Sequence, residues 1–222
     1  AIAESELEEG IIWTGSDDGL IHVTRNGGET WENVTPPLNI SPKLNMINSI
    51  DPCPFTKGKV YVAATSYKFG DYTPYLYKTS DYGKSWELIT EGIPNNYYTR
   101  ALRSDKKRSG LLYAGTEWGM FISFDDGLSW NDFQLNLPVT SIRDIHIKDN
   151  DLIVATHGRS FWMIDDLTPL HQLNNSSLES NAILFKPDKS YRLAQSGGWR
   201  KPNTLLAVSY THLRAHETVL DL

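Results

Sequence analysis

A short motif occurs three times along this 222-residue chain, and it constrains the fold more than any other feature. The motif has Ser or Thr at its first position, Asp or Asn at the third, Gly at the fifth, Ser or Thr at the seventh and Trp at the eighth. Its copies are residues 24–31 (TRNGGETW), 79–86 (TSDYGKSW) and 123–130 (SFDDGLSW). Three matches to one pattern indicate an internal structural repeat.

Each copy of the motif follows two short apolar runs that a turn separates. The pairs of runs are IIWTGS with LIHVT, VYVAAT with YLYKT, and LLYAGT with MFISF; a fourth pair, LIVATH with FWMID, follows at 152–165 without the motif. A further apolar run precedes each of the last three pairs, at 47–51, 100–105 and 142–149. The repeat therefore predicts four short antiparallel strands per unit, with the fourth beginning at the motif tryptophan.

Four-stranded units that recur about every 40 to 50 residues are typical of propeller blades, because one such sheet cannot bury both of its faces alone. The predicted fold class is all-β, an incomplete β-propeller of about three and a half four-stranded blades. Residues 1–167 are expected to form the blades, and 168–207 an exit linker toward a further domain. The final stretch, 208–222, matches nothing upstream and is expected to be a non-native tail.

The motif residues have structural roles on the turn between the third and fourth strands. The short acceptors at the third position are expected to cap backbone N–H groups of the turn: Asn26, Asp81 and Asp125. The glycines supply a backbone conformation that side chains resist: Gly28, Gly83 and Gly127. The tryptophans are expected to be buried against a neighbouring blade: Trp31, Trp86 and Trp130. Other turn residues, such as Asp126 and Lys84, are expected to be exposed.

The repeated motif resembles the Asp-box, or BNR, repeats of sialidases, sortilin-type receptors, xyloglucanases and plant photosystem-assembly propellers. The run at 154–166 (VATHGRSFWMIDD) is similar to a bacterial group of large secreted proteins described as sortilin-like or glycosyl hydrolase BNR-repeat proteins. The resemblance covers roughly residues 11–200. It implies a propeller in a secreted or cell-envelope protein, with the motif turns on the face away from the ligand.

Composition argues against several classes of function. The net charge is −6, and the longest basic run is 106–108, whereas nucleic-acid binding usually needs a concentrated positive face. The single cysteine, Cys53, excludes an internal disulfide. No stretch approaches the roughly 20 apolar residues of a membrane span. The six histidines are scattered, so we predict no metal site and no cofactor.

Strand connectivity predicts where a ligand would bind. Alternate turns of an antiparallel blade lie on opposite faces, so the turns between second and third strands lie opposite the motif turns. Those turns also carry the variation between repeats, as expected of recognition loops. Aligning the first strands places Asn48, Arg100 and Arg143 at equivalent positions near the same end. The candidate ligand-binding residues on this face are Asp18, Arg100, Glu117, Trp118, Arg143, His157 and Arg159.

Structural alternatives exist for most of these residues. Arg100 and Arg143 could pair with carboxylates such as Asp105 or Asp144. His157 and Arg159 could tie their turn to the adjacent blade, and Trp118 could be a packing residue at the rim.

Two functions are compatible with this pattern. The first is a binding or scaffolding module of a secreted or cell-envelope protein that recognises a glycan or peptide, with the remaining propeller blades of the same chain as partners. The alternative is the catalytic propeller of a glycoside hydrolase, which needs two carboxyl groups about 5 to 10 Å apart. Asp18 and Glu117 are the candidate pair, whereas the Tyr–Glu nucleophile pair that a sialidase resemblance implies has no assignable counterpart. The sequence leaves the choice between binding and catalysis open.

The tail gives a direct test of the predicted domain boundaries. Because residues 209–222 depart from the repeat pattern, deleting them is expected to leave the melting temperature of the protein unchanged. Thermal unfolding of the two chains checks this, and a lower melting temperature after deletion would show that the tail belongs to the fold.

Overall fold

The structure is a computed structural model that describes residues 1–41, 45–173 and 182–187. All of the described strands and helices belong to one compact unit, residues 1–186. The tail predicted at 208–222 and most of the predicted linker lie outside the described residues. Among the helices described, none is long and apolar enough to cross a membrane.

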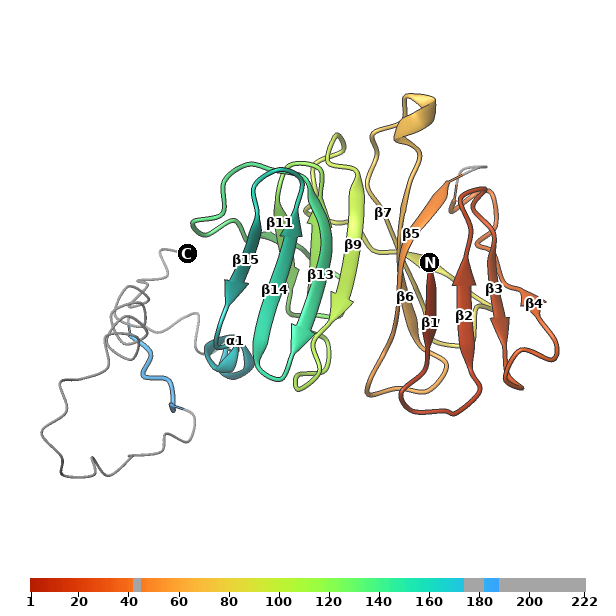
Figure 1. The fold of residues 1–222 in the computed structure, drawn as a ribbon, viewed down its shortest axis with the longest axis horizontal. Coiled ribbons are helices and arrows are strands. Elements are labelled where there is room, and N and C mark those ends of the chain that lie inside the picture. The colour runs from red at the N-terminus through yellow and green to blue at the C-terminus, as the bar shows by residue number, and fades with distance from the viewer. Residues whose placement is uncertain (42–44, 174–181, 188–222) are drawn as a thin grey trace, which may run out of the picture. The chain divides into compact units, whose positions relative to one another are not determined.

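The described residues form four antiparallel sheets that follow one another along the chain (Figure 1). Blade 1 contains β1 (Ile2–Glu4), β2 (Ile12–Gly15), β3 (Ile21–Thr24) and β4 (Glu32–Asn33). Blade 2 contains β5 (Met46–Pro52), β6 (Val60–Thr65), the 3-10 helix η1 (Tyr67–Phe69), β7 (Tyr75–Thr79) and β8 (Glu87–Leu88). Blade 3 contains β9 (Thr99–Ser104), β10 (Leu112–Thr116), β11 (Met120–Ser123) and β12 (Asn131–Asp132). Blade 4 contains β13 (Ile142–Lys148), β14 (Asp151–Thr156) and β15 (Phe161–Ile164), and α1 (Thr168–Gln172) follows it.

This architecture confirms the predicted fold class, an incomplete β-propeller built from antiparallel blades. Strand order in every sheet follows sequence order, as expected when each turn joins neighbouring strands. Sequence analysis did not predict β1, which completes blade 1. The fourth strands are only two residues long and begin one residue after the motif tryptophan.

Side chains pack between consecutive blades and form three apolar layers. Trp13 and Val23 of blade 1 pack with Val62 of blade 2, and the other two layers follow the same plan. All six residues of β6 and all five of β10 are buried, because these middle strands have a blade on each side. This explains why their sequences are continuously apolar instead of alternating.

The first strand of each of blades 2, 3 and 4 contains a β-bulge at the same position. In β5, β9 and β13 the pairing with the second strand skips one residue, and those residues are Asn48, Arg100 and Arg143. The predicted equivalence of these three positions is therefore confirmed. A bulge changes the direction of the side chain at that position, so blades 2, 3 and 4 each present one side chain at the same end.

The three motif turns share one set of hydrogen bonds. The first-position hydroxyl accepts the N–H of the glycine, as in Thr79 Oγ1 with Gly83 N at 3.0 Å. The third-position side chain accepts the N–H four residues later, as in Asp81 Oδ1 with Ser85 N at 2.9 Å. The equivalent bonds of the other copies are those of Thr24, Asn26, Ser123 and Asp125. Hydrogen bonding by Ser85 lowers the pKa of Asp81 to about 2, so this carboxylate is a turn cap.

The prediction that all three motif tryptophans are buried is correct for two and wrong for the third. Trp86 is 7% exposed and its indole Nε1 donates to the backbone carbonyl of Val34 in blade 1, at 2.7 Å. Trp130 is 4% exposed and donates to the carbonyl of Ile89 in blade 2, at 2.8 Å. Trp31 is 44% exposed, because within the described chain no blade precedes blade 1 to cover it.

Asp126 also departs from its predicted exposed position. Its carboxylate lies 2.7 Å from Lys59 Nζ and 3.1 Å from Lys78 Nζ, and it accepts a 2.5 Å hydrogen bond from the Tyr61 hydroxyl. All three partners belong to blade 2, so Asp126 ties the motif turn of blade 3 to the preceding blade. Lys84 is exposed, as predicted.

The first residues of the predicted linker pack against the blades. Leu170 of α1 and Leu173 are buried in the apolar layer between blades 3 and 4. His171 Nε2 lies 2.9 Å from Asp105 Oδ2 in blade 3. The helix thus covers an end of this layer.

The tryptophan contacts predict unequal effects of the same substitution. Trp86→Ala should lower the free energy of unfolding by about 3 to 5 kcal/mol, because it opens a cavity between two blades and leaves the Val34 carbonyl without its donor. Trp31→Ala should cost less than about 1 kcal/mol, because that side chain is already half exposed. Urea unfolding of both variants checks this, and equal losses would contradict the contact pattern.

The Asp126 cluster predicts a dependence of stability on pH. Burial alone would raise the pKa of Asp126, but hydrogen bonds from Lys59, Tyr61 and Lys78 hold it below its ordinary value. A lowered folded-state pKa stabilises the fold above the unfolded-state pKa of about 3.9, and this contribution is lost as pH falls through the folded value. Asp126→Asn should cost about 1 to 3 kcal/mol at pH 7, and the difference from wild type should shrink below about pH 4. A difference that stays constant between pH 7 and pH 3 would show that the charge is unimportant.

Candidate ligand-binding site

The blades have two distinct ends, which backbone hydrogen bonds define. At one end, each motif turn contacts the turn between the first and second strands of its own blade, as in Tyr82 N with Gly58 O. At the other end, the connection between blades contacts the hairpin between second and third strands, as in Glu117 N with Tyr98 O and His157 N with Ser141 O. We call the second end the mouth. It carries the bulge residues and all seven candidate ligand-binding residues.

Arg100 and Glu117 form an ion pair at the mouth of blade 3. Arg100 Nη2 lies 2.8 Å from Glu117 Oε2, and Arg100 Nε donates to the same oxygen at 2.9 Å. Ser141 Oγ, from the segment leading into blade 4, also donates to Glu117 Oε2 at 2.8 Å. The side chains of Arg100 and Glu117 are 10% and 22% exposed. The pair lies within blade 3, is linked by Ser141 to the segment that leads into blade 4, and is partly shielded from water.

Two tyrosine rings lie against the Arg100 guanidinium. Its Cζ atom lies 4.8 Å from the ring centroids of both Tyr67 and Tyr98, within the range of cation–π attraction. Tyr67 comes from η1 in the long hairpin of blade 2, and its ring stacks on Tyr98 with centroids 5.2 Å apart. Tyr72 from the same hairpin is 52% exposed and lies 5.8 Å from Tyr98. The extended hairpin of blade 2 thus covers the mouth of blade 3 with aromatic surface.

Hydrogen bonding keeps Glu117 ionised. Burial alone would raise its pKa, but the Ser141 hydroxyl and the Arg100 guanidinium together hold the pKa below the ordinary range of a glutamate. A carboxylate in this state stabilises positive charge and accepts hydrogen bonds. It is a poor proton donor at neutral pH.

Blade 4 presents basic side chains at the mouth. Arg143 occupies the bulge of β13, and His157 and Arg159 lie on the hairpin between β14 and β15. The pairing of Ile142 with Thr156 places this hairpin beside the bulge. All three side chains are exposed, and none has a carboxylate partner among the described residues. This end of blade 4 offers two guanidinium groups and an imidazole to solvent.

The remaining candidates lie apart from this cluster. Asp18 is exposed on the hairpin of blade 1, where the Ser16 hydroxyl donates to it and lowers its pKa. Trp118 is 47% exposed beside Glu117. The structure therefore brings Arg100 and Glu117 together, and it places Arg143, His157 and Arg159 on the neighbouring blade.

The structure also decides between the alternatives for the arginines. Arg100 is paired, but with Glu117 instead of Asp105 or Asp144. Asp144 pairs with Arg103 at 2.9 Å, and Asp105 contacts His171, so neither carboxylate reaches the mouth. Sequence reasoning missed Ser141, for which the only signal was its place directly before a bulge strand.

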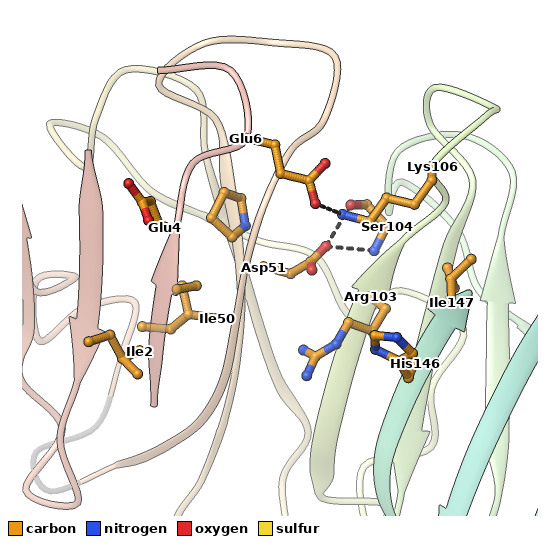
Figure 2. Close-up of a pocket in the computed structure, with 12 residues that line it drawn as sticks. Ile2, Glu4, Glu6, Ile50, Asp51, Arg103, Ser104, Lys106, His146 and Ile147 are labelled. Carbon is orange, nitrogen blue, oxygen red and sulfur yellow. Dashed lines mark hydrogen bonds and ion pairs between the residues drawn. The ribbon is translucent and has the colours of Figure 1, made fainter. Parts of the chain in front are cut away.

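A pocket of about 330 Å³ lies at a place that sequence analysis did not single out (Figure 2). The first strands of all four blades line it, mainly with residues toward their carboxyl ends, which are the ends farther from the mouth. Its polar lining residues are Glu4, Glu6, Asp51, Arg103, Ser104, Lys106 and His146, and the apolar ones include Ile2, Ile50, Pro52 and Ile147. The signal in the sequence was the polar residues at the carboxyl ends of the first strands.

Solved structures of other proteins share the fold of this chain. No family model and no curated protein matches the chain. Among solved structures, YCF48 bound to D1 peptide is similar with a TM-score of 0.52 and 18% identity, over 69% of this chain and 45% of that one. The GH74 xyloglucanase of Xanthomonas campestris is similar with a TM-score of 0.58 and 14% identity, over 74% of this chain and 28% of that one. The extracellular domain of a putative one-component system of B. thetaiotaomicron has a TM-score of 0.54 and 17% identity, over 74% of this chain and 21% of that one.

These structures include a peptide-bound protein, an enzyme and the extracellular domain of a putative one-component system. The likeness therefore identifies the fold and does not identify an activity. The chain spans less than about half of the length of each. It is a β-propeller module.

Proposed function

We propose that this chain is a binding module whose mouth recognises a carboxylate-bearing peptide or glycan. The observation that carries the proposal is the set of exposed basic side chains on blade 4, Arg143, His157 and Arg159, beside the aromatic surface of blades 2 and 3. Guanidinium groups bind carboxylates through paired hydrogen bonds, and tyrosine and tryptophan faces pack against sugar rings or peptide side chains. Peptide binding by the structurally similar YCF48 is consistent with this.

The states of the candidate carboxylates favour binding over glycoside hydrolysis. A glycosidase needs one carboxyl group that stays protonated, and burial or a like charge usually raises its pKa. Asp18 and Glu117 both have lowered pKa values, and Glu117 is already occupied by Arg100 and Ser141. The geometry thus supports ligand recognition at the mouth.

The repeated motif supports a proposal about the protein family and the location of the module. We infer that the chain belongs with Asp-box proteins of the sortilin-like group and works outside the cytoplasm. The half-exposed Trp31 supports the further proposal that additional blades of a longer chain pack on blade 1, because Trp86 and Trp130 each use the equivalent surface to bind a blade.

Binding screens test the mouth directly. The protein should bind acidic peptides or uronate-containing glycans more tightly than their amidated or neutral counterparts. Arg143→Ala and Arg159→Ala should each weaken binding by about tenfold, because each removes a charge-assisted contact. Lys84→Ala, an exposed lysine on a motif turn, should leave affinity unchanged. Isothermal titration calorimetry provides the measurement.

Two results would change the conclusion. Binding that survives both arginine substitutions but is lost in Lys84→Ala would place the ligand at the motif turns. Hydrolysis of a glycan that Glu117→Gln abolishes would establish the glycoside hydrolase alternative.

A further inference from the structure

The pocket at the far end of the first strands contains a buried carboxyl group with one unused oxygen. Asp51 is 7% exposed, and its Oδ2 atom accepts two hydrogen bonds from Ser104, from the backbone N–H at 2.7 Å and from Oγ at 2.5 Å. Its Oδ1 atom has no hydrogen-bond partner among the described residues. Because Asp51 lines the pocket, as Figure 2 shows, this oxygen is available to a ligand there.

The two permanently charged basic side chains that line the pocket, Arg103 and Lys106, already have acidic partners. Lys106 Nζ lies 2.7 Å from Glu6 Oε1, and this pair joins blade 3 to blade 1. Arg103 Nη2 lies 2.9 Å from Asp144 Oδ1, and Arg103 Nη1 donates to Ser49. The guanidinium and the ammonium are therefore largely neutralised within the protein.

Two acidic groups remain after these pairs are formed. Glu4, on β1, is exposed and has no ion-pair partner among the described residues. Asp51 accepts hydrogen bonds only from Ser104 among the described residues, and Arg103 and Lys106 act on its charge from a longer distance. Burial raises the pKa of Asp51, so a cation placed beside it would stabilise the ionised form. The pocket and its partner residues thus contain four carboxyl groups (Glu4, Glu6, Asp51 and Asp144) against two permanent cations, so the uncompensated charge favours a cationic ligand.

The apolar lining narrows the class of cation. Ile2, Ile50, Pro52 and Ile147 supply aliphatic surface around the acidic groups. A long aliphatic stem with a charged end packs its methylenes on such surface and keeps the charge on polar partners. A metal ion would use none of this surface, and no group of three or more His, Cys, Asp or Glu side chains in the described residues could hold one.

We propose that this pocket binds a primary ammonium group on an aliphatic stem, such as a lysine side chain of a peptide or an alkylamine. The ammonium donates to Asp51 Oδ1, with Glu4 contributing a second negative charge at the pocket wall. The stem packs on the isoleucines, and the volume of about 330 Å³ is within the usual range of small-molecule pockets. The site lies at the opposite end of the first strands from the mouth, so it is independent of the function proposed there.

Matched ligands test the charge requirement on the full chain. n-Butylamine should bind in a titration followed by NMR, with shifts at Asp51, Ser104 and Ile147, whereas n-butanol of the same shape should bind at least about tenfold more weakly. A short blocked peptide with a central lysine, compared with its norleucine counterpart, shows whether a peptide side chain can enter. Binding of the amine alone assigns the site to free amines, and binding of both assigns it to lysine side chains as well.

Matched variants test the residues. Asp51→Asn keeps the shape and an oxygen acceptor for Ser104 but removes the charge, and it should weaken butylamine binding by about tenfold or more. Glu4→Gln, at an exposed side chain with no ion-pair partner among the described residues, should weaken it by a smaller factor. Glu29→Gln, an exposed glutamate outside the pocket, is the control and should have no effect. Thermal unfolding shows whether each variant is folded. If Asp51→Asn does not fold, the effect of Glu4→Gln on butylamine binding tests the proposal.

Three results would overturn the proposal. They are equal binding of butylamine and butanol, absence of butylamine binding at millimolar concentration, and loss of binding in Glu29→Gln as large as in the pocket variants.

Discussion

The structure depends on one repeated contact, the hydrogen bond from a motif tryptophan to a backbone carbonyl of the preceding blade. Trp86 donates to Val34, and Trp130 donates to Ile89. In both cases the acceptor lies just after a two-residue fourth strand, which has few ladder hydrogen bonds to hold it in place. The indole supplies a large apolar surface and a donor at once, so the same side chain fixes the outer strand of one blade and the spacing to the next.

Glycine at the motif's fifth position makes this contact possible. A Cβ atom on Gly83 would lie 2.5 Å from Val34 Cβ, and one on Gly127 would lie 2.6 Å from Ile89 Cδ1. Both glycines also have positive φ values, 83° and 85°. The motif therefore combines a turn conformation, a close approach between blades and an indole anchor. Asp126 adds an ionic contact across the same interface in one copy only.

The same architecture separates the stabilising contacts from the proposed recognition surface. The motif turns and the apolar layers between blades use most of the large buried side chains. The mouth, by contrast, carries hairpins that differ from blade to blade, and the bulges in β5, β9 and β13 present Asn48, Arg100 and Arg143 there. Asn48 donates to the Thr99 carbonyl of the next blade, Arg100 contacts two tyrosine rings and pairs with Glu117, and Arg143 is exposed. One backbone feature thus gives three different chemical environments, because the neighbouring blade differs in each case.

The sequence alone determined the fold class, the blade order and the turn geometry, because these follow from local patterns. The spacing of the motif gave the repeat, and the residue types at its third and fifth positions required a capped turn with positive φ. It did not determine which tryptophan is covered, because Trp31, Trp86 and Trp130 have the same local sequence and differ only in whether a blade precedes them. The partner of Arg100 was equally open, since Glu117, Asp105 and Asp144 are all possible by charge. The tertiary structure alone brought Glu117 to Arg100, Asp126 to two lysines of another blade, and Asp51 to a pocket formed by four separate strands. Each of these contacts joins residues of different strands, and the last two join different blades, so local sequence patterns do not specify them.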